Sequence, residues 1–348
     1  MEKVSIKIKD EKAPIVGITI GDAAGIGPEI ALKAAGDPEV VSVCRPVLIG
    51  DISFLDRVSR TLAGARKLVP FVESIESSRE GIAVLDTHNL PEEVPVGIDD
   101  PVTGKASAEC IQLAVDHLKA GSIDAVATAP ISKKAIALGG YSFPGHTEFL
   151  ADLTETLRFS MSFFADSLRV VLLSTHLPLR EAIDLVRQDK LVPLISFTDR
   201  EMSKLLGRKV SIAVAGINPH ASEGGMFGDE EENEIIPAIE KCREDMGINV
   251  TGPYSPDTVF LRGFRGEFDV VIACYHDQAT IAVKSLSFGS AVNVTLGLPI
   301  IRTSVDHGTA YDIAGKGVAD ASSMKAAIVL AAELVRTRRS DSFAETLS

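Results

Sequence analysis

The stretch Pro14-Ile-Val-Gly-Ile-Thr-Ile20, followed directly by Gly21-Asp-Ala-Ala-Gly-Ile-Gly-Pro-Glu29, decides the fold class. Its first part is a nearly continuous apolar and β-branched run, which predicts a short strand covered on both faces. Its second part is rich in glycine and places Pro28 and Glu29 where the first turn of a helix favours proline and acidic side chains. The stretch therefore predicts a buried strand that turns sharply into a helix.

Further runs of the same kind recur along the chain, and helical patterns lie among them. The expected strands cover residues 124–128, 168–174, 210–216 and 268–274. The expected helices cover residues 106–120, 229–242 and 326–335. Strands that alternate with helices in this way predict a doubly wound α/β architecture. The chain has 348 residues, a length that suits two lobes or one large α/β domain.

The composition narrows the class of partner. A formal net charge of −13 argues against nucleic acid and against an anionic membrane surface, because both attract basic proteins. No apolar run approaches the roughly 20 residues that cross a bilayer. The four cysteines are widely spaced, which predicts buried thiols and a cytoplasmic protein: Cys44, Cys110, Cys242 and Cys274. An anionic small molecule remains compatible with this charge, because a few cations in a cleft outweigh a distant acidic surface.

The glycine-rich turn at residues 21–27 does not match a nucleotide-binding fingerprint. Its glycines do not fit GxGxxG, and no GK[ST] follows, so it is neither a Rossmann turn nor a P-loop. Two interpretations stay open for it: a tight strand-to-helix turn, or a ligand-facing loop. A nucleotide enzyme with this sequence has to hold its cofactor elsewhere.

Three of the seven histidines, His176, His220 and His276, each follow the end of an expected strand. Ligands of open α/β sheets bind at the carboxyl ends of the strands. Imidazole is a common ligand of zinc and similar metals, and three protein nitrogens leave positions open for substrate or water. These residues therefore predict a divalent-metal site.

Other side chains are candidates for binding an anion. His146 and Thr147 stand just before an expected helix, where they either meet an anion or simply cap the helix. Lys133 and Lys134 follow the strand at 124–128. Lys284 and Arg302 flank Asn293 in the sequence and are plausible contacts to phosphate or carboxylate.

Several longer motifs identify a family. They are GDAAGIGPEI (21–30), TAPISKKAI (128–136), FPGHTE (143–148), STHLPLR (174–180), INPHASEGG (217–225), GPYSPDTVF (252–260), YHDQ (275–278) and NVTLGLPIIRTSVDHGTAYDIAGKG (293–317). Together they make the chain resemble, over nearly its whole length, the 4-hydroxythreonine-4-phosphate dehydrogenases and their relatives that act on phosphorylated threonate and erythronate. Residues 307–320 are also similar to the adenosine-binding loop of isopropylmalate and isocitrate dehydrogenases.

The resemblance implies a fold and an assembly. The fold is a two-lobed α/β/α structure like that of isocitrate and isopropylmalate dehydrogenases, with the active site in the cleft between the lobes. Residues 13–130 with 290–340 form the first lobe and residues 131–289 the second. The protein is a homodimer with a shared active site, to which His276 is contributed across the interface.

The resemblance also implies roles for individual residues. One divalent metal (zinc, magnesium, cobalt or manganese) is bound by His176, His220 and His276. The substrate, a small phosphorylated hydroxy acid, is bound by His146, Thr147, Lys284, Asn293 and Arg302. Asp257 or Lys133 is the catalytic base. The cofactor, NAD or NADP, is bound by His307, Gly308, Thr309, Ala310 and Asp312.

The implied reaction oxidises the C3 hydroxyl of 4-hydroxythreonine-4-phosphate to a β-keto acid, which loses CO₂ to give 3-amino-2-oxopropyl phosphate for pyridoxal phosphate biosynthesis. Two features leave the identity of the substrate open. Ser222 and Ala279 stand where the family usually has glycine, and the segment 226–230 looks more like the catabolic relatives that act on phosphorylated threonate and erythronate. The alternative substrates are 4-phospho-D-threonate and 4-phospho-D-erythronate, which give dihydroxyacetone phosphate and CO₂. Alternatives from other classes are a non-catalytic ligand-binding protein on the same scaffold and a metal-dependent hydrolase.

Overall fold

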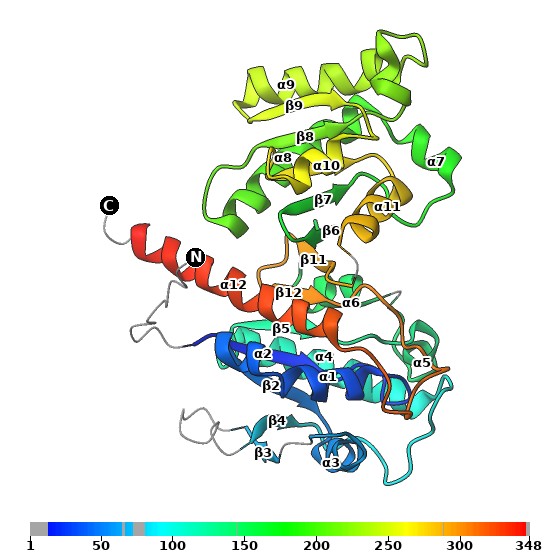
Figure 1. Ribbon diagram of the computed structural model, residues 1–348, viewed down its shortest axis with the longest axis vertical. Coiled ribbons are helices and arrows are strands. Elements are labelled where there is room, and N and C mark those ends of the chain that lie inside the picture. The colour runs from blue at the N-terminus through cyan, green and yellow to red at the C-terminus, as the bar shows by residue number, and fades with distance from the viewer. Residues whose placement is uncertain (1–12, 65–66, 72–80, 144, 288, 346–348) are drawn as a thin grey trace, which may run out of the picture.

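The computed structural model of the protein describes residues 13–64, 67–71, 81–143, 145–287 and 289–345, with only the backbone described at 341–345. Its strands form one 12-stranded sheet that runs the length of the molecule (Figure 1). Across the sheet the order is β3 (Leu68–Pro70), β4 (Ile82–Asp86), β2 (Arg45–Gly50), β1 (Ile15–Thr19), β5 (Ala125–Thr128), β12 (Ile301–Ser304), β11 (Val292–Leu296), β6 (Ser160–Ala165), β7 (Leu168–Leu172), β10 (Val270–Ala273), β8 (Ile212–Ala215) and β9 (Val250–Tyr254). The α/β fold class predicted from the sequence is confirmed.

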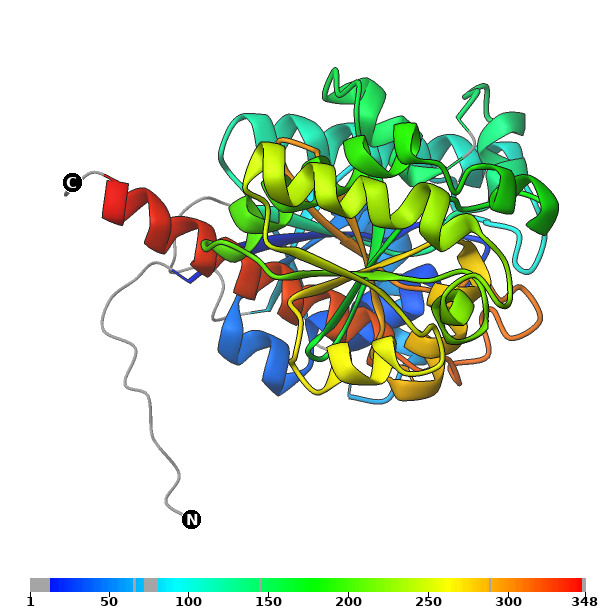
Figure 2. The ribbon, with the colours of Figure 1, turned by 90° about the horizontal axis from the view of Figure 1, so that it is seen from above.

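Helices cover both faces of this sheet, as the view along its length shows (Figure 2). Over the first half of the sheet lie α1 (Gly27–Ala35), α2 (Pro38–Val43), α3 (Ile52–Thr61), α4 (Pro101–Lys119), α5 (Lys133–Leu138), α6 (His146–Leu153) and α12 (Ser322–Glu345). Over the second half lie α7 (Leu179–Asp184), α8 (Gln188–Leu206), α9 (Ile236–Met246), α10 (Val259–Phe264) and α11 (His276–Leu286), with a tight turn at Pro219–Glu223 and a π-helical turn at Glu231–Ile235. Within the described residues, no helix is long and apolar enough to span a membrane.

The strands expected from apolar runs are present and are buried on both faces. All residues of β1, β5, β8 and β10 are buried, as their nearly continuous apolar sequences predict. The expected helix at 106–120 begins earlier, at Pro101. Asp100 caps it by accepting hydrogen bonds from the backbone N–H groups of Val102 and Thr103.

The sheet contains two blocks of parallel strands that run in opposite directions. The reversal takes place in the middle, where β11 is antiparallel to β12 and to β6, and β6 is antiparallel to β7. The carboxyl ends of β1, β5 and β12 therefore lie at one edge of the sheet, and those of β7, β8 and β10 at the other. A cavity that draws on both sets of strand ends has to extend across the face of the central strands.

Candidate active site

A cavity of about 590 Å³ lies over the face of the central strands. Its floor includes Arg302 of β12, Asn293 of β11 and Met161 of β6, and its rim includes segments that follow β5, β7, β10 and β12. Among the residues singled out in the sequence, the cavity is lined by Lys133, His146, Thr147, His176, His276, Lys284, Asn293, Arg302 and His307. His220, Asp257, Gly308, Thr309, Ala310 and Asp312 do not line it.

Arg302 is a buried cation that has no carboxylate within hydrogen-bonding distance among the described residues. Its side chain donates to the hydroxyl of Thr128 from Nε (3.2 Å) and Nη2 (2.9 Å) and to that of Thr295 from Nη1 (3.0 Å), and Nη1 also reaches Asn293 Oδ1 at 3.3 Å. Burial lowers the pKa of Arg302 to about 9, so the guanidinium remains charged at neutral pH. Glu148, which lines the same cavity, acts on it only through space and raises its pKa. A buried charge held only by neutral groups at a cavity wall is poised for an anion. Asp306, a possible partner for Arg302 by sequence, instead accepts from Ser323 Oγ.

His146 contributes a neutral imidazole to the same cavity. It begins α6, and its Nε2 is shielded from solvent without a hydrogen-bond partner among the described residues. Burial, and to a smaller extent the charge of Arg302, lowers the pKa of His146 well below its usual value. A buried polar atom without a partner is costly. His146 Nε2 is therefore available to a ligand that brings its own donor or acceptor.

Two lysines add exposed positive charge at the cavity. Lys133 and Lys284 both line it, and both are exposed. Lys134, the neighbour of Lys133, points elsewhere and pairs with Asp99 at 3.2 Å. Glu148 and Asp306 also line the cavity, so its described lining holds three cations, Arg302 and these two lysines, against two carboxylates. This small excess of positive charge favours an anionic ligand in an otherwise acidic protein.

Two of the three candidate metal ligands lie side by side in this chain. The rings of His176 and His276 are 5.7 Å apart between centroids. Asp277 Oδ1 lies 2.7 Å from Nδ1 of His276, which leaves Nε2 of this ring free. A carboxylate on the outer nitrogen of an imidazole is a common feature of metal-binding histidines. The pair therefore fits a divalent metal, although no cluster of three potential ligands occurs among the described side chains.

His220 lies on a separate, unusual loop after β8. It is exposed, and its ring is 6.4 Å from that of Phe227. It begins a run of residues with positive φ, a backbone conformation that costs a non-glycine residue about 1–2 kcal/mol. One of these residues is Ser222, at φ +64°, the position where the resembling family usually has glycine. The loop is thus held in a conformation that its sequence does not favour locally.

The two candidate bases differ in position. Lys133 lies at the cavity, at the first residue of α5. Asp257 is exposed beyond the cavity lining, and its carboxylate accepts a hydrogen bond from the hydroxyl of Ser255. Within one chain, only Lys133 is placed to act on a molecule in the cavity.

The candidate cofactor loop is seated on the glycine-rich turn that follows β1. The backbone N–H of Ile26 donates to Thr309 O at 3.0 Å, and a Cβ placed on Gly25 would lie 2.8 Å from the same oxygen. Tyr311 Oη donates to the buried carboxylate of Asp22 at 2.7 Å. The glycines let the backbones of the turn and the loop approach closely. These contacts therefore support the interpretation of residues 21–27 as a tight strand-to-helix turn.

Some residues that shape the site were not singled out in the sequence. Thr128 orients Arg302, and Asp22 with Tyr311 anchors the candidate cofactor loop. All three lie inside the motifs that carry the family resemblance, which is the only sequence signal that marks them. Glu231, fully buried beside the His220 loop, lies in a run of acidic residues that predicts only a helix start.

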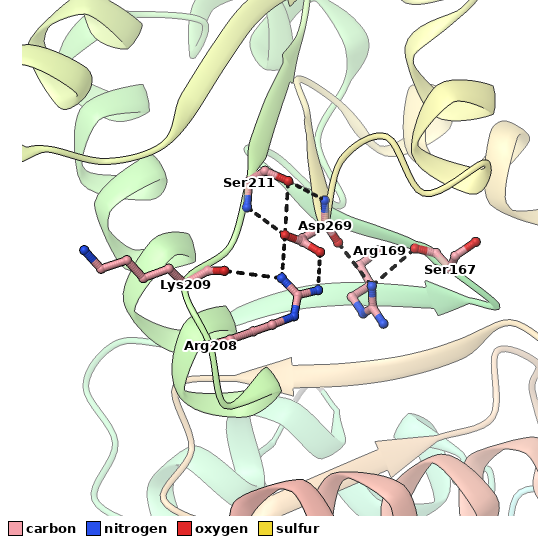
Figure 3. A network of polar contacts seen from close by, with 6 residues as sticks. All are labelled: Ser167, Arg169, Arg208, Lys209, Ser211 and Asp269. Atoms are coloured by element: carbon pink, nitrogen blue, oxygen red, sulfur yellow. Dashed lines mark hydrogen bonds and ion pairs between the residues drawn. The ribbon is translucent and has the colours of Figure 1, made fainter. Parts of the chain in front are cut away.

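The opposite ends of β8 and β10 carry a different kind of polar cluster (Figure 3). Asp269, just before β10, accepts hydrogen bonds from Arg208 Nη1 at 2.9 Å, from Ser211 N at 2.8 Å and from Ser211 Oγ at 3.1 Å. Arg208 Nη2 also contacts the carboxylate, and Arg169 donates to the backbone carbonyls of Asp269 and Ser167. The hydrogen bonds from Arg208 lead the effects that hold the pKa of Asp269 at about 2.

Comparison with known proteins identifies the family. The family described as pyridoxal phosphate biosynthetic protein PdxA matches residues 42–331. A 4-hydroxythreonine-4-phosphate dehydrogenase of Desulforapulum autotrophicum is 45% identical, over 92% of this chain and 96% of its own length. A D-threonate 4-phosphate dehydrogenase of Cupriavidus necator is 44% identical, over 94% of this chain and 98% of its own.

Solved structures agree with this assignment. The crystal structure of 4-hydroxythreonine-4-phosphate dehydrogenase from Klebsiella pneumoniae superposes with a TM-score of 0.83 at 38% identity, and the match covers 93% of this chain and 100% of that one. The family and the dehydrogenase class predicted from the sequence are confirmed, so the protein is assigned to the oxidoreductases. The chain belongs to the PdxA family of dehydrogenases.

Proposed function

We propose that the protein is a metal-dependent NAD(P) dehydrogenase that oxidises the C3 hydroxyl of 4-hydroxythreonine-4-phosphate. The product is a β-keto acid, which loses CO₂ to give 3-amino-2-oxopropyl phosphate, a step of pyridoxal phosphate biosynthesis. The observation that carries the proposal is the buried Arg302 guanidinium, which faces the same cavity as the His176–His276 pair and has only neutral hydrogen-bond partners. A substrate with an anionic end and a hydroxyl end matches these two features.

The anionic end of the substrate binds at Arg302 and Lys284. Arg302 supplies a fixed, buried guanidinium, Lys284 an exposed ammonium, and Asn293 an amide between them in the cavity wall. His146 offers a neutral Nε2, and Thr147 follows it at the start of α6. These contacts orient C3 of the substrate and hold its phosphate or carboxylate away from water.

The hydroxyl end lies at the histidines. His176, His276 and His220 hold one divalent metal (zinc, magnesium, cobalt or manganese), and Asp277 fixes the ring of His276. When bound, such an ion supplies Lewis-acid chemistry that lowers the pKa of an alcohol. Lys133, at the cavity, is the better placed of the two candidate bases for removing the hydroxyl proton.

The cofactor, NAD or NADP, binds at the loop that contains His307, Gly308, Thr309, Ala310 and Asp312. His307 lines the cavity, and Thr309 is anchored to the glycine-rich turn, so the loop joins the substrate cavity to the first half of the sheet. This arrangement supports delivery of the nicotinamide to the C3 side of the cavity.

The assembly is a homodimer with a shared active site. Large apolar side chains are exposed near each candidate metal histidine, which supports an interface there: Leu177, Leu179, Met226, Phe227 and Ile281. The resemblance assigns His276 as the ligand that crosses to the other subunit. Because His176 and His276 already lie together in one chain, His220 is the alternative crossing ligand. Four buried free cysteines support a cytoplasmic protein.

Mixing inactive chains distinguishes the two assignments. If the partner contributes His220, a heterodimer of His176→Ala and His220→Ala chains contains one intact site. It should regain up to half of the activity per dimer. A heterodimer of His176→Ala and His276→Ala should stay inactive. Recovery in the second mixture and none in the first would give the crossing role to His276, and no recovery in either proven heterodimer would exclude a shared site.

A second candidate substrate is D-threonate 4-phosphate. It is favoured by the similarity, at 44% identity over nearly the full length, to a dehydrogenase of that name. This substrate differs from the first by a hydroxyl in place of the C2 amine and uses the same anionic contacts. It would give dihydroxyacetone phosphate and CO₂, as 4-phospho-D-erythronate also would.

The deciding assay measures NADH or NADPH formation with 4-hydroxythreonine-4-phosphate, D-threonate 4-phosphate and D-erythronate 4-phosphate side by side. We expect turnover that a chelator abolishes and a divalent metal restores. His276→Ala should reduce kcat by at least about a hundredfold, whereas His88→Asn, at an exposed histidine outside the cavity, should leave it unchanged. Absence of reduced cofactor with all three substrates would refute the proposal.

A further inference from the structure

The loop that carries His220 has the most unusual backbone in the described chain. Six consecutive residues, 220–225, have positive φ, and the first four are not glycine: His220 (54°), Ala221 (53°), Ser222 (64°) and Glu223 (48°). Residues with side chains rarely adopt this conformation, and usually do so singly. A run of this kind persists only where the surrounding structure imposes it.

The carboxylate of Glu231 fixes the segment that leads into this left-handed run. Glu231 is fully buried, and its Oε1 accepts hydrogen bonds from the backbone N–H groups of Ile217 and Asn218, both at 2.8 Å. Its Oε2 accepts from the side-chain amide of Asn218, also at 2.8 Å. Three donors on one buried side chain fix the two residues that lead into Pro219 and His220.

The base of the loop is also tied to the helix of His276. Gln278, in the first turn of α11, donates from Nε2 to Gly216 O at 2.8 Å and accepts from Cys274 N at 2.7 Å. A Cβ on Gly216 would lie 3.0 Å from Oε1 of Glu231 and 2.9 Å from Cβ of Ala221, so the loop folds closely over this point. The same buried framework thus contacts the segments of both histidines.

Glu231 reaches this position through an irregular helix start. Residues Glu231–Ile235 form a π-helical turn before α9 begins at Ile236. π-Helical turns are rare overall, but those that occur are often found at functional sites. The exposed Glu232 beside it follows the ordinary pattern of an acidic helix start, whereas Glu231 is turned inward.

We propose that Glu231 is a positioning residue for His220: its three hydrogen bonds hold the left-handed loop in the conformation that presents the imidazole to a divalent metal before the metal binds. The inference rests on the proposed function, because it takes His220 as a metal ligand. A preformed ligand loop does not have to be ordered during binding, so its affinity is higher than that of a mobile one. Loss of a group that orients a metal ligand typically weakens metal binding about ten- to a hundredfold.

The test is Co²⁺ titration of the full-length, metal-free protein, followed by visible absorption. Glu231→Gln keeps the size of the side chain but places an NH₂ group opposite an N–H donor in either orientation. We expect its Co²⁺ affinity to fall about ten- to a hundredfold, and amide hydrogen exchange of residues 217–225 to accelerate. The matched control is Glu240→Gln, on the exposed face of α9, which should change neither.

Two further variants separate positioning from mere stability. Glu231→Asp withdraws the carboxylate by one methylene and should also weaken Co²⁺ binding, which covers the case in which Glu231→Gln fails to fold. Adding Glu223→Gly to the Glu231→Asp variant should restore part of the affinity, because this exposed residue also has positive φ and glycine adopts the left-handed conformation without strain.

Each outcome has one meaning. Unchanged Co²⁺ affinity in a folded Glu231 variant, even with a lowered melting temperature, overturns the inference and leaves Glu231 a structural residue. Failure of the wild-type protein to bind Co²⁺ at all overturns the metal-dependent function instead. Weakened binding that Glu223→Gly does not improve shows that Glu231 acts otherwise than by holding the left-handed loop.

Discussion

The two ends of β8 and β10 carry opposite kinds of polar chemistry. At their amino ends, Asp269 is surrounded by Arg208 and Ser211, and its pKa is held at about 2 (Figure 3). Toward their carboxyl ends, the chain enters a strained loop at His220 and a histidine pair beside the cavity that holds Arg302. The first cluster is complete in itself, whereas in the second the guanidinium has no directly hydrogen-bonded carboxylate among the described residues, and only the more distant Glu148 acts on its charge.

The difference shows how similar residue types serve stability in one place and binding in another. The Arg208 guanidinium pairs with the carboxylate of Asp269 and so links the segment before β8 to the segment before β10. The Arg302 guanidinium is more deeply buried, yet within the described part of the chain it donates hydrogen bonds only to hydroxyls and an amide, and Glu148 acts on it only through space. Burial without a counter-ion stores an unfavourable energy that a bound anion releases. The comparison therefore predicts that each arginine affects one property and spares the other.

Replacing Arg302 should have the largest effect. Arg302→Gln should weaken binding of the phosphorylated substrate about a hundredfold, about 2.7 kcal/mol, and that of its dephosphorylated analogue hardly at all. The melting temperature of the free protein should stay the same or rise, because a buried unpaired charge is removed. Steady-state kinetics and thermal denaturation check both. Equal losses on the two substrates would show that Arg302 does not hold the phosphate.

Asp269→Asn should do the reverse. It leaves Arg208 without its partner and should lower the free energy of unfolding by about 2–3 kcal/mol, with unchanged kcat/KM. Chemical denaturation gives the first quantity and the dehydrogenase assay the second. Glu267→Gln, at the exposed pair with Arg262, is the control and should cost at most about 1 kcal/mol. A loss of activity as large as that of the Arg302 variant would erase the contrast between the clusters.

Acid should remove part of the Asp269 contribution. Because its pKa is about 2 in the folded protein and about 3.9 when unfolded, the carboxylate adds stability above pH 4 that is lost as the pH falls toward 2. The wild-type advantage over Asp269→Asn should therefore shrink by about 2 kcal/mol across that window. Unfolding curves at pH 6, 4, 3 and 2 measure it. An advantage that stays constant down to pH 2 would mean that the ionised carboxylate is not its source.

Thr128→Val should have the smallest effect. The hydroxyl of Thr128 accepts two hydrogen bonds from Arg302, so its loss lets the guanidinium shift without removing its charge. We expect KM for the phosphorylated substrate to rise about five- to tenfold, about 1–1.4 kcal/mol, with little change in kcat. Thr198→Val is the control, because this buried hydroxyl has no partner among the described residues. If the two variants behave alike, Thr128 does not orient Arg302.

The sequence revealed the strands that are buried on both faces, and β7, but not the central strands β6, β11 and β12. β8 and β10 are apolar throughout, and β1 and β5 are interrupted only by glycine or a final threonine, so their pattern is clear. The central strands β11 and β12 carry Asn293 and Arg302, whose polar side chains serve the cavity and interrupt that pattern. The functional demand on these strands hides them from an argument based on hydrophobicity.

The site was predictable in its residue types and not in its geometry. Strand-end positions marked the three histidines, a position before an expected helix marked His146, and proximity to Asn293 in the sequence marked Arg302; the family resemblance then gave each of them a role. None of these signals shows that Arg302 has no hydrogen-bonded carboxylate among the described residues, that Asp257 lies outside the cavity, or that Glu231 turns inward, because these facts depend on which segments meet in space. The helix expected at 229–242 starts instead with a π-helical turn at Glu231–Ile235 and continues as α9 from Ile236, because the inward turn of Glu231 also depends on tertiary contacts.

The central antiparallel strands also limit how the two halves of the molecule move. The halves are joined through β12, β11, β6 and β7, which are hydrogen-bonded side by side, rather than through a flexible linker alone. Relative rotation of the halves must therefore appear as a change in the twist of these strands, shared over several of them, and not as a swing about one joint. The cavity floor consists of the same strands, so any such torsion moves Arg302 and Asn293 directly. Binding of a ligand at Arg302 and the twist of the sheet are therefore coupled: a change in one changes the other.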